Sequence, residues 1–124
     1  YFVAPEALQM PDYICRELRK NSVKFSFHNK IEDIVNKVDI LYMTRIQAER
    51  FADPLDYERV KNVFILKKNM LVKAKPNMKI LHPLPRVNEI ANDIDDTKHA
   101  YYFKQAENGL YVRQALLALV LGQL

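Results

Sequence analysis

A histidine, an arginine and two prolines stand close together at His82-Pro83-Leu84-Pro85-Arg86. The mostly apolar tetrad before them, 78–81, predicts a buried strand. The prolines should end it in a stiff loop, because each ring fixes its own φ and restricts the residue before it. The loop then holds an imidazole, a guanidinium and free main-chain carbonyls at a strand end, where ligands of open α/β sheets bind. Taken alone, the five residues also fit a simple strand terminator beside a surface histidine.

A second polar set follows another predicted strand. Residues 38–43 are apolar at nearly every position, which predicts a central strand, and Arg45, Gln47, Glu49 and Arg50 come after it. In a parallel sheet both strand ends lie at the carboxyl edge, so the two sets can face one crevice. Arg45 offers a planar fork for a carboxylate, Gln47 a donor and an acceptor, and the loop carbonyls can accept from an amine. These groups predict a site for a small zwitterion with an extra carboxylate, unless Arg45 and Glu49 are only an i,i+4 surface pair.

Strands alternate with helices along the chain. Strands are predicted at 1–4, 23–27, 38–43 and 78–81, and helices at 11–20, 29–37, 54–61 and from about residue 67, followed by a helix that carries 101–103 behind a cap at Thr97. This order predicts an α/β fold, a mainly parallel sheet flanked by helices.

The apolar pattern at the C-terminal end of the chain predicts a helix that is buried in the assembled protein. Residues 109–121 form a predicted helix that is apolar on every side, and such a helix must be buried on every side. A small sheet covers only one side, so we expect another domain or subunit to cover the rest. We therefore divide the chain into a main part, 1–108, and a C-terminal apolar helix, 109–124. The chain opens in a strand without an initiator Met, which suggests a fragment of a longer chain.

Composition excludes several classes of protein. With 124 residues, 49% hydrophobic and 27% charged, the chain is one soluble domain, too short for two substrate-binding lobes. Basic and acidic residues alternate at a net charge of +4, which does not favour a nucleic-acid surface, and no apolar run is long enough for a membrane span. The single Cys15 fits a reducing cytoplasm. Isolated histidines and the lack of a Gly-rich loop after a strand predict neither a metal site nor a cofactor.

Three separated motifs resemble the catalytic chain of aspartate carbamoyltransferase. They are 38–50 (Val-Asp-Ile-Leu-Tyr-Met-Thr-Arg-Ile-Gln-Ala-Glu-Arg), 82–90 (His-Pro-Leu-Pro-Arg-Val-Asn-Glu-Ile) and 114–121 (Gln-Ala-Leu-Leu-Ala-Leu-Val-Leu). The resemblance covers the whole chain, but only the second half of such a catalytic chain, the aspartate-binding domain. The Ser-Thr-Arg-Thr motif that binds phosphate in the first half is absent.

The resemblance implies roles for the residues after the third predicted strand. Arg45 would clamp the side-chain carboxylate of aspartate, and Gln47 would help to orient the amine end of the substrate. Glu49 would brace Arg45, and Arg50 would pair with the other domain on closure.

It also implies roles for the proline loop. His82 would contact the carbamoyl carbonyl oxygen as the catalytic residue. The main-chain carbonyls of Pro83 and Leu84 would accept from the carbamoyl NH2 and from the amine of aspartate. Arg86 is a further substrate-binding candidate, and Asn88 stands where the family often has an acid.

The implied reaction transfers the carbamoyl group of carbamoyl phosphate to L-aspartate, giving N-carbamoyl-L-aspartate and phosphate, in de novo pyrimidine biosynthesis. The implied partners are an N-terminal carbamoyl-phosphate domain, which the C-terminal helix packs against, and a homotrimer of catalytic chains with or without regulatory chains. Alone, the segment should be inactive. Two alternatives stay open. One is an ornithine-type carbamoyltransferase, which usually has Cys where Pro83 stands and lacks an arginine like Arg45. The other is a non-catalytic α/β assembly module.

Overall fold

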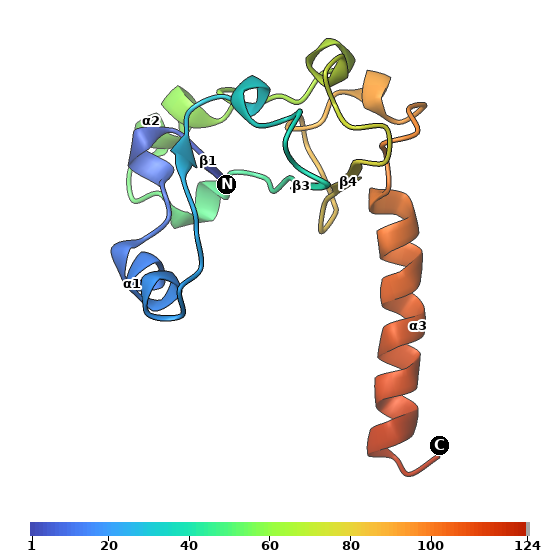
Figure 1. Cartoon of the computed structure of the whole chain (residues 1–124). Coiled ribbons are helices and arrows are strands. Elements are labelled where there is room, and N and C mark those ends of the chain that lie inside the picture. Colours follow the sequence, from blue (N-terminus) through green and yellow to red (C-terminus); the bar gives the residue numbers. More distant parts are fainter. Residues whose placement is uncertain (124) are drawn as a thin grey trace.

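The computed structural model describes residues 1–123, except for the side chain of Arg50. The strands are β1 (Phe2–Val3), β2 (Phe27–His28), β3 (Ile40–Tyr42) and β4 (Lys79–Leu81), and the helices are α1 (Asp12–Lys20), α2 (Pro54–Val60) and α3 (Tyr102–Val120). Short 3₁₀ turns lie between them. The chain forms an arch, with α1 projecting from one side of the body and α3 running away from the other (Figure 1).

The strands form two short parallel sheets. In one, Phe2 of β1 lies opposite Phe27 of β2; in the other, Leu41 of β3 lies opposite Ile80 of β4. Parallel pairs with helices between them confirm the predicted α/β class. The central position predicted for β3 is not seen among the described residues, where β3 pairs with β4 alone. A cavity of about 780 Å³ opens between β1 and β3.

The hydrophobic core gathers around β3 and β4. Leu41 and Ile80, opposite each other across the sheet, are both buried. The other buried members of the cluster are Ile31, Ile34, Val35, Met43, Leu66, Leu71, Met78, Ile90, Ile94 and Tyr102. Beside β4, the N–H of Ile80 donates to the carbonyl of His99, and the N–H of Tyr101 donates to the carbonyl of Ile80. These bonds hold the start of α3 against β4, close to the loop that follows it.

Two of the predicted helices are only short 3₁₀ turns in the structure, and the helix predicted from about residue 67 is the turn Lys68–Leu71. Residues 29–37 contain only the 3₁₀ turn Ile31–Asp33, and no side chain caps it. Ile31, Ile34 and Val35 are all buried there, so tertiary packing outweighs the weak helix propensity of these β-branched residues. By contrast, α2 begins as predicted, because the side chain of Asp53 accepts from the N–H of Leu55 at 2.8 Å.

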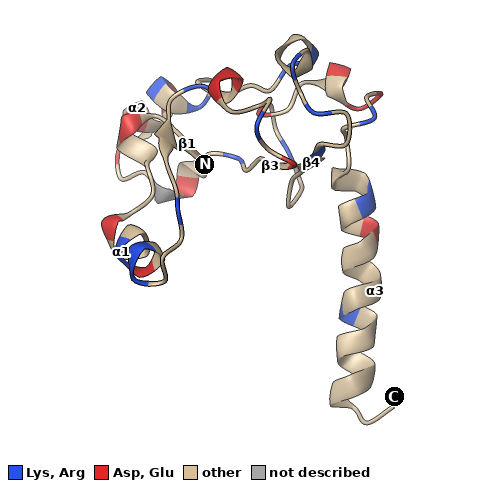
Figure 2. Ribbon diagram, in the orientation of Figure 1, with Lys and Arg blue, Asp and Glu red and all other residues tan. Residues whose placement is uncertain are grey.

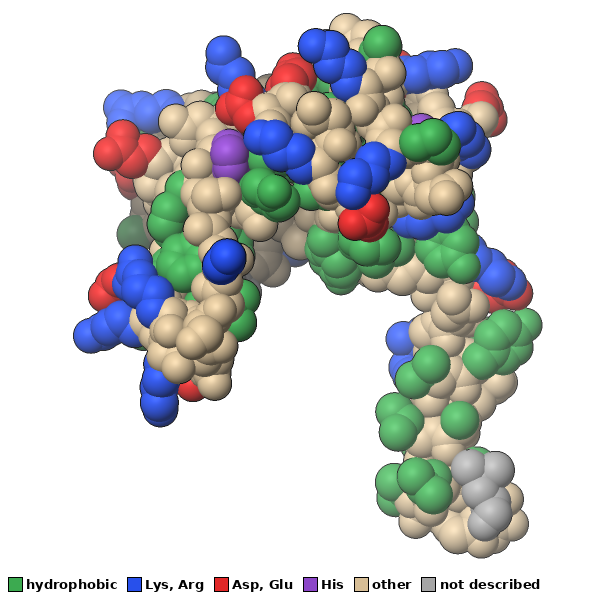
Figure 3. Space-filling model, viewed as in Figure 1, with side chains coloured by type: hydrophobic (Ala, Val, Ile, Leu, Met, Phe, Trp, Pro, Cys, Tyr) green, Lys and Arg blue, Asp and Glu red, His purple; other side chains and the backbone are tan. Residues whose placement is uncertain are grey.

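The last two predicted helices are one. The 19-residue α3 runs without a break through Gly109, and Thr97 does not cap it. Its charged residues are Lys104, Glu107 and Arg113, so the helix carries no charge beyond Arg113 (Figure 2), and residues 115–120 are all apolar. The side chains there, Leu116, Leu117, Leu119 and Val120, are between 55% and 82% exposed, and the helix stands clear of the body (Figure 3). That another domain covers it stays a prediction. No helix in the described part of the chain is long and apolar enough to cross a membrane.

Candidate functional site

A groove of about 500 Å³ lies beyond the carboxyl ends of β3 and β4. Because the two strands are parallel and in register, the segments that follow them leave the same edge of the sheet side by side. The groove is lined by Thr44, Arg45, Gln47, His82, Pro83, Leu84 and Pro85. The structure thus brings together five of the residues predicted for the site, from two motifs almost forty positions apart, while Glu49 and Arg86 do not line the groove.

The wall that follows β3 is open to solvent. The side chain of Arg45 is 40% exposed, and its Nη2 lies 2.5 Å from Oε1 of Glu49. Glu49 therefore forms an ion pair with the guanidinium, while part of the Arg45 side chain stays exposed. That Glu49 acts as a brace stays a prediction. Gln47 is half-buried beside it. The side chain of Arg50, predicted to pair with another domain, lies outside the described residues.

The wall that follows β4 is built from buried polar contacts. The imidazole of His82 is 1% exposed, and its Nε2 lies 2.7 Å from Oε1 of Glu89. The N–H of Leu84 donates to Nδ1 of the same ring at 2.9 Å. Since Nδ1 accepts, the hydrogen of a neutral ring is on Nε2 and points at Glu89. Both ring nitrogens are thus engaged within the chain, an arrangement that does not support the predicted hydrogen bond from His82 to a substrate carbonyl.

Leu84 has a strained backbone. Its φ is +48°, in the left-handed region, which costs an L-residue about 1–2 kcal/mol. The hydrogen bond from its N–H to His82 stabilises this conformation, and its side chain packs against the core. The loop therefore turns sharply at Leu84, where the prediction places the acceptor carbonyls.

Glu89 holds the loop from the inside. Its side chain is only 6% exposed, and its Oε2 accepts from the N–H groups of Val87 and Asn88, each at 3.1 Å. Burial raises the pKa of the Glu89 carboxyl, but hydrogen bonds from backbone N–H groups and from His82 outweigh it, so the pKa lies below its usual range. Glu89 is therefore ionised at neutral pH.

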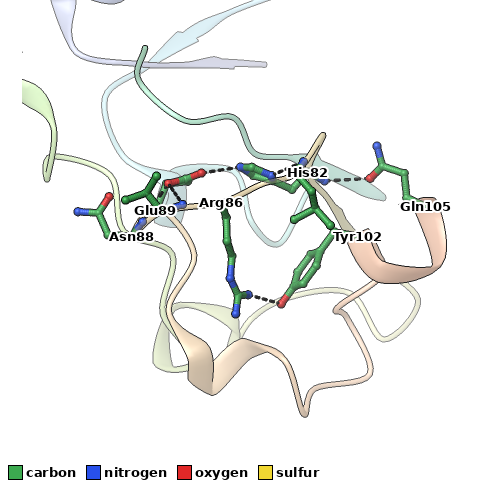
Figure 4. Close-up of polar contacts among 8 residues, drawn as sticks. His82, Arg86, Asn88, Glu89, Tyr102 and Gln105 are labelled. Carbon is green, nitrogen blue, oxygen red and sulfur yellow. Dashed lines mark hydrogen bonds and ion pairs between the residues drawn. The ribbon is translucent and has the colours of Figure 1, made fainter. Parts of the chain in front are cut away.

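Arg86 anchors the far end of the loop. Its Nη1 and Nη2 lie 2.5 and 2.6 Å from the two carboxylate oxygens of Asp95. Nη1 also donates to the hydroxyl of Tyr102 at 3.0 Å, the contact drawn in Figure 4. Arg86 holds the pKa of the Asp95 carboxyl below its usual range, while burial and the hydrogen bond to Asp95 raise the pKa of Tyr102 to about 12. The guanidinium of Arg86 is thus held within this cluster, and its role in substrate binding stays a prediction.

Helix α3 touches the loop at both ends. Besides Tyr102 at Arg86, Gln105 accepts through Oε1 from the N–H of His82 at 2.9 Å (Figure 4). Glu89, Asp95, Tyr102 and Gln105 were all missed from the sequence. Asp95, Tyr102 and Gln105 contact loop residues that lie nine to 23 positions away in the sequence. Neither hydrophobic periodicity nor a short motif predicts a contact of that kind.

No group of three or more potential metal ligands occurs within the described part of the chain. The groove offers three kinds of group: the cation of Arg45, which can bind a carboxylate; the amide of Gln47; and the main-chain groups of the fixed loop at Pro83 and Leu84.

Asn88 stands at the position where the resemblance suggested an acid. Its side chain donates a hydrogen bond to Asn62.

Comparison with known proteins shows the family of the chain. The family model for the aspartate/ornithine carbamoyltransferase Asp/Orn binding domain matches residues 1–120. The chain belongs to this family. It is 57% identical over 123 residues to the aspartate carbamoyltransferase catalytic subunit of Photobacterium profundum, and 53% identical to that of Chromobacterium violaceum; each alignment covers 99% of this chain and 40% of the relative. The chain thus spans about two fifths of the length of these relatives.

Solved structures extend the similarity to the fold of this carbamoyltransferase domain. The catalytic subunit of M. jannaschii aspartate transcarbamoylase superposes with a TM-score of 0.86 at 42% identity, covering 100% of this chain and 41% of that one. Aspartate transcarbamoylase from Trypanosoma cruzi, in complex with carbamoyl aspartate and phosphate, superposes with a TM-score of 0.76 at 33% identity. The superposition covers 94% of this chain and 36% of that one.

Proposed function

We propose that these residues are the aspartate-binding part of an aspartate carbamoyltransferase catalytic chain. The reaction moves the carbamoyl group of carbamoyl phosphate to the amine of L-aspartate, giving N-carbamoyl-L-aspartate and phosphate in de novo pyrimidine biosynthesis. The observation that carries the proposal is the groove in which Arg45 and Gln47 face the loop of Pro83 and Leu84.

The groove supplies complementary groups for aspartate. The fork of Arg45 suits the side-chain carboxylate, because an arginine–carboxylate pair forms two parallel charge-assisted hydrogen bonds. Main-chain carbonyls of Pro83 and Leu84 can accept from the amine of aspartate and from the carbamoyl NH2. The neutral amine held in this way attacks the carbonyl carbon of carbamoyl phosphate, the bond from that carbon to the phosphate oxygen breaks, and the departing phosphate takes up the proton that the amine loses. Holding both substrates in one geometry supplies much of the acceleration.

His82 takes a different part from the one that the resemblance implies. A hydrogen bond from its ring to the carbonyl oxygen would first require the imidazole to leave Glu89 or Leu84. We therefore propose that charge on the carbonyl oxygen is stabilised by groups outside this chain segment, and that His82 acts on the loop.

Aspartate suits the groove better than ornithine does. The side chain of ornithine ends in an ammonium, which Arg45 would repel, whereas the second carboxylate of aspartate pairs with it. Pro83 stands where ornithine enzymes usually have Cys. The curated relatives described above are also named as aspartate enzymes. A purely structural assembly module explains the exposed α3 but leaves the groove without a role.

The proposal extends to partners. We propose that an N-terminal domain binding carbamoyl phosphate covers the apolar half of α3, and that Arg50 pairs with that domain when the site closes. Catalytic chains of this kind would assemble as homotrimers in the cytoplasm, with or without regulatory chains. The exposed Leu116, Leu117, Leu119 and Val120 support a covering partner, since monomers rarely expose so large an apolar patch.

The test is a chimera in which residues 1–124 replace the corresponding part of the Photobacterium profundum catalytic subunit, which is 57% identical. We expect the chimera to form N-carbamoyl-L-aspartate, to ignore ornithine and to be trimeric by light scattering. The isolated 124-residue chain should be inactive and should self-associate. Turnover by an isolated monomer, or a preference for ornithine in the chimera, would contradict the proposal.

A further inference from the structure

We propose that Glu89 is a positioning residue of the groove: through the imidazole of His82 it fixes the main chain of Leu84, and with it the carbonyls that receive the amino groups of the substrates. This inference rests on the proposed function for the identity of the substrates. It assigns a task to a buried carboxylate that lines no groove and contacts no substrate.

The carboxylate of Glu89 is surrounded by hydrogen-bond donors. One carboxylate receives the Nε2–H of His82 on Oε1 and the N–H groups of Val87 and Asn88 on Oε2 (Figure 4). Its own carbonyl accepts from the N–H of Leu66 at 2.9 Å, so its backbone is also tied to a buried segment. Glu89 therefore connects a fixed part of the core to the ring of His82.

From the ring of His82, the contacts continue to the groove. With Nε2–H held by Glu89, the unprotonated Nδ1 faces Leu84 and accepts its N–H. That bond holds Leu84 at a positive φ, a conformation that a β-carbon disfavours. Its carbonyl direction is thus set by a relay that starts at Glu89. Since a misplacement of about 1 Å can cost roughly 100-fold in rate, a small turn of this carbonyl matters.

The carboxylate is specifically required. The amide that Glu89→Gln introduces has one oxygen, which can serve either His82 or the two N–H groups of Val87 and Asn88. If the oxygen serves the N–H groups, the amide NH2 faces Nε2, and the ring hydrogen moves to Nδ1 and meets the N–H of Leu84. If the oxygen faces His82, the NH2 meets the two backbone donors. Either choice breaks one link of the relay.

The experiment uses the chimera and four variants: Glu89→Gln, His82→Ala, His82→Asn and the double variant His82→Ala/Glu89→Gln. The substitution His82→Asn keeps an acceptor near the position of Nδ1 but removes the imidazole. Ile94→Val, a buried substitution away from the groove, controls for loss of stability alone. Rates are expressed per folded site, counted by circular dichroism and sedimentation.

We expect Glu89→Gln to lower kcat by about 10- to 100-fold while the KM of carbamoyl phosphate changes little, and Ile94→Val to change neither. His82→Ala should lose at least as much, His82→Asn should recover most of it, and the double variant should be no worse than His82→Ala. Normal kcat in Glu89→Gln, additive losses in the double variant, or a His82→Asn variant as slow as the His82→Ala variant would overturn the inference. An inactive unmodified chimera would instead contradict the proposed function.

Discussion

The two walls of the groove differ in how far their charged and polar side chains are exposed to solvent. After β3, Arg45 and Glu49 form an ion pair whose side chains are 40% and 55% exposed. After β4, the side chains of His82 and Glu89 are 1% and 6% exposed and are joined by hydrogen bonds to the loop. One wall presents a side chain, and the other presents a main chain held by buried side chains.

This difference suggests a division of tasks. A partly exposed guanidinium can exchange its partner for a ligand carboxylate at small cost, because water still solvates both charges. A buried network cannot exchange partners without leaving a group unsatisfied, so it is suited to hold geometry. Substitutions on the first wall should therefore change binding, and substitutions on the second should change stability or the rate of the chemical step.

The largest effect is expected at Arg45. In the chimera, Arg45→Ala should lower kcat/KM for aspartate by on the order of 100-fold or more, about 3 kcal/mol, because a charge-assisted pair with the substrate is lost. The melting temperature should hardly change, since the side chain is partly exposed. Steady-state kinetics with aspartate and a thermal melt measure both.

Arg16→Ala is a matched control for Arg45→Ala. Arg16 is also an exposed arginine with an i,i+4 carboxylate partner, Asp12, but it lies on α1, away from the groove. Its removal should leave the kinetics intact. Aspartate kinetics in Arg45→Ala that resemble those of Arg16→Ala would show that the first wall does not bind the carboxylate.

Arg86→Ala should mainly reduce stability. The substitution leaves the partly buried carboxylate of Asp95 and the hydroxyl of Tyr102 without their cation, which we expect to cost about 2 kcal/mol and to lower the melting temperature by several degrees. Arg59→Ala removes an exposed ion pair with Asp56 and should lower the melting temperature much less. A raised aspartate KM without a lower melting temperature would support the substrate-binding role first predicted for Arg86.

Sequence reasoning was most successful where information is local. The α/β class, α1 with its proline start, the Asp53 cap and the position of the groove at two strand ends all follow from neighbouring residues. It failed for 29–37, where burial of Ile34 and Val35 outweighs a helical pattern. It also placed a helix boundary near Gly109, inside α3.

The site shows the same limit. Motif spacing brought Arg45 and Gln47 to the same groove as Pro83 and Leu84, but it could not say which groups face it. His82 has the residue type of a catalytic group, yet the contacts with Glu89 and Leu84 occupy both ring nitrogens. Those contacts depend on the positive φ of Leu84 and on a buried carboxylate. Neither the backbone conformation of Leu84 nor the burial of Glu89 can be predicted from the spacing of the motif.

Acid should affect the second wall more than the first. The pKa values of Glu89 and Asp95 lie below their usual ranges in the folded chain. Their stabilising contribution is therefore fully present above the ordinary carboxyl pKa of about 4 and is lost as pH falls through the lower folded values. The difference in melting temperature between the chimera and its Glu89→Gln variant should shrink below that pH. His82 is the titratable group in contact with Glu89, so the comparison is repeated with His82→Asn, and a difference that grows with acid would contradict the assignment.

The smallest effect is expected from Glu49→Gln, the same chemical change that Glu89→Gln makes on the other wall. Glu49 pairs with Arg45 from an exposed position, and exposed pairs contribute about 0.2–1 kcal/mol. We expect kcat/KM for aspartate to fall by less than about 5-fold, with an unchanged melting temperature, and the effect to weaken in 1 M salt, where the Debye length is about 3 Å. The two Glu→Gln variants, measured side by side, test the division of tasks directly. If Glu49→Gln lowers kcat as much as Glu89→Gln does, and salt leaves that loss unchanged, then the first wall is also a fixed scaffold. Arg45 would in that case be a preorganised part of it rather than a side chain that exchanges Glu49 for the ligand.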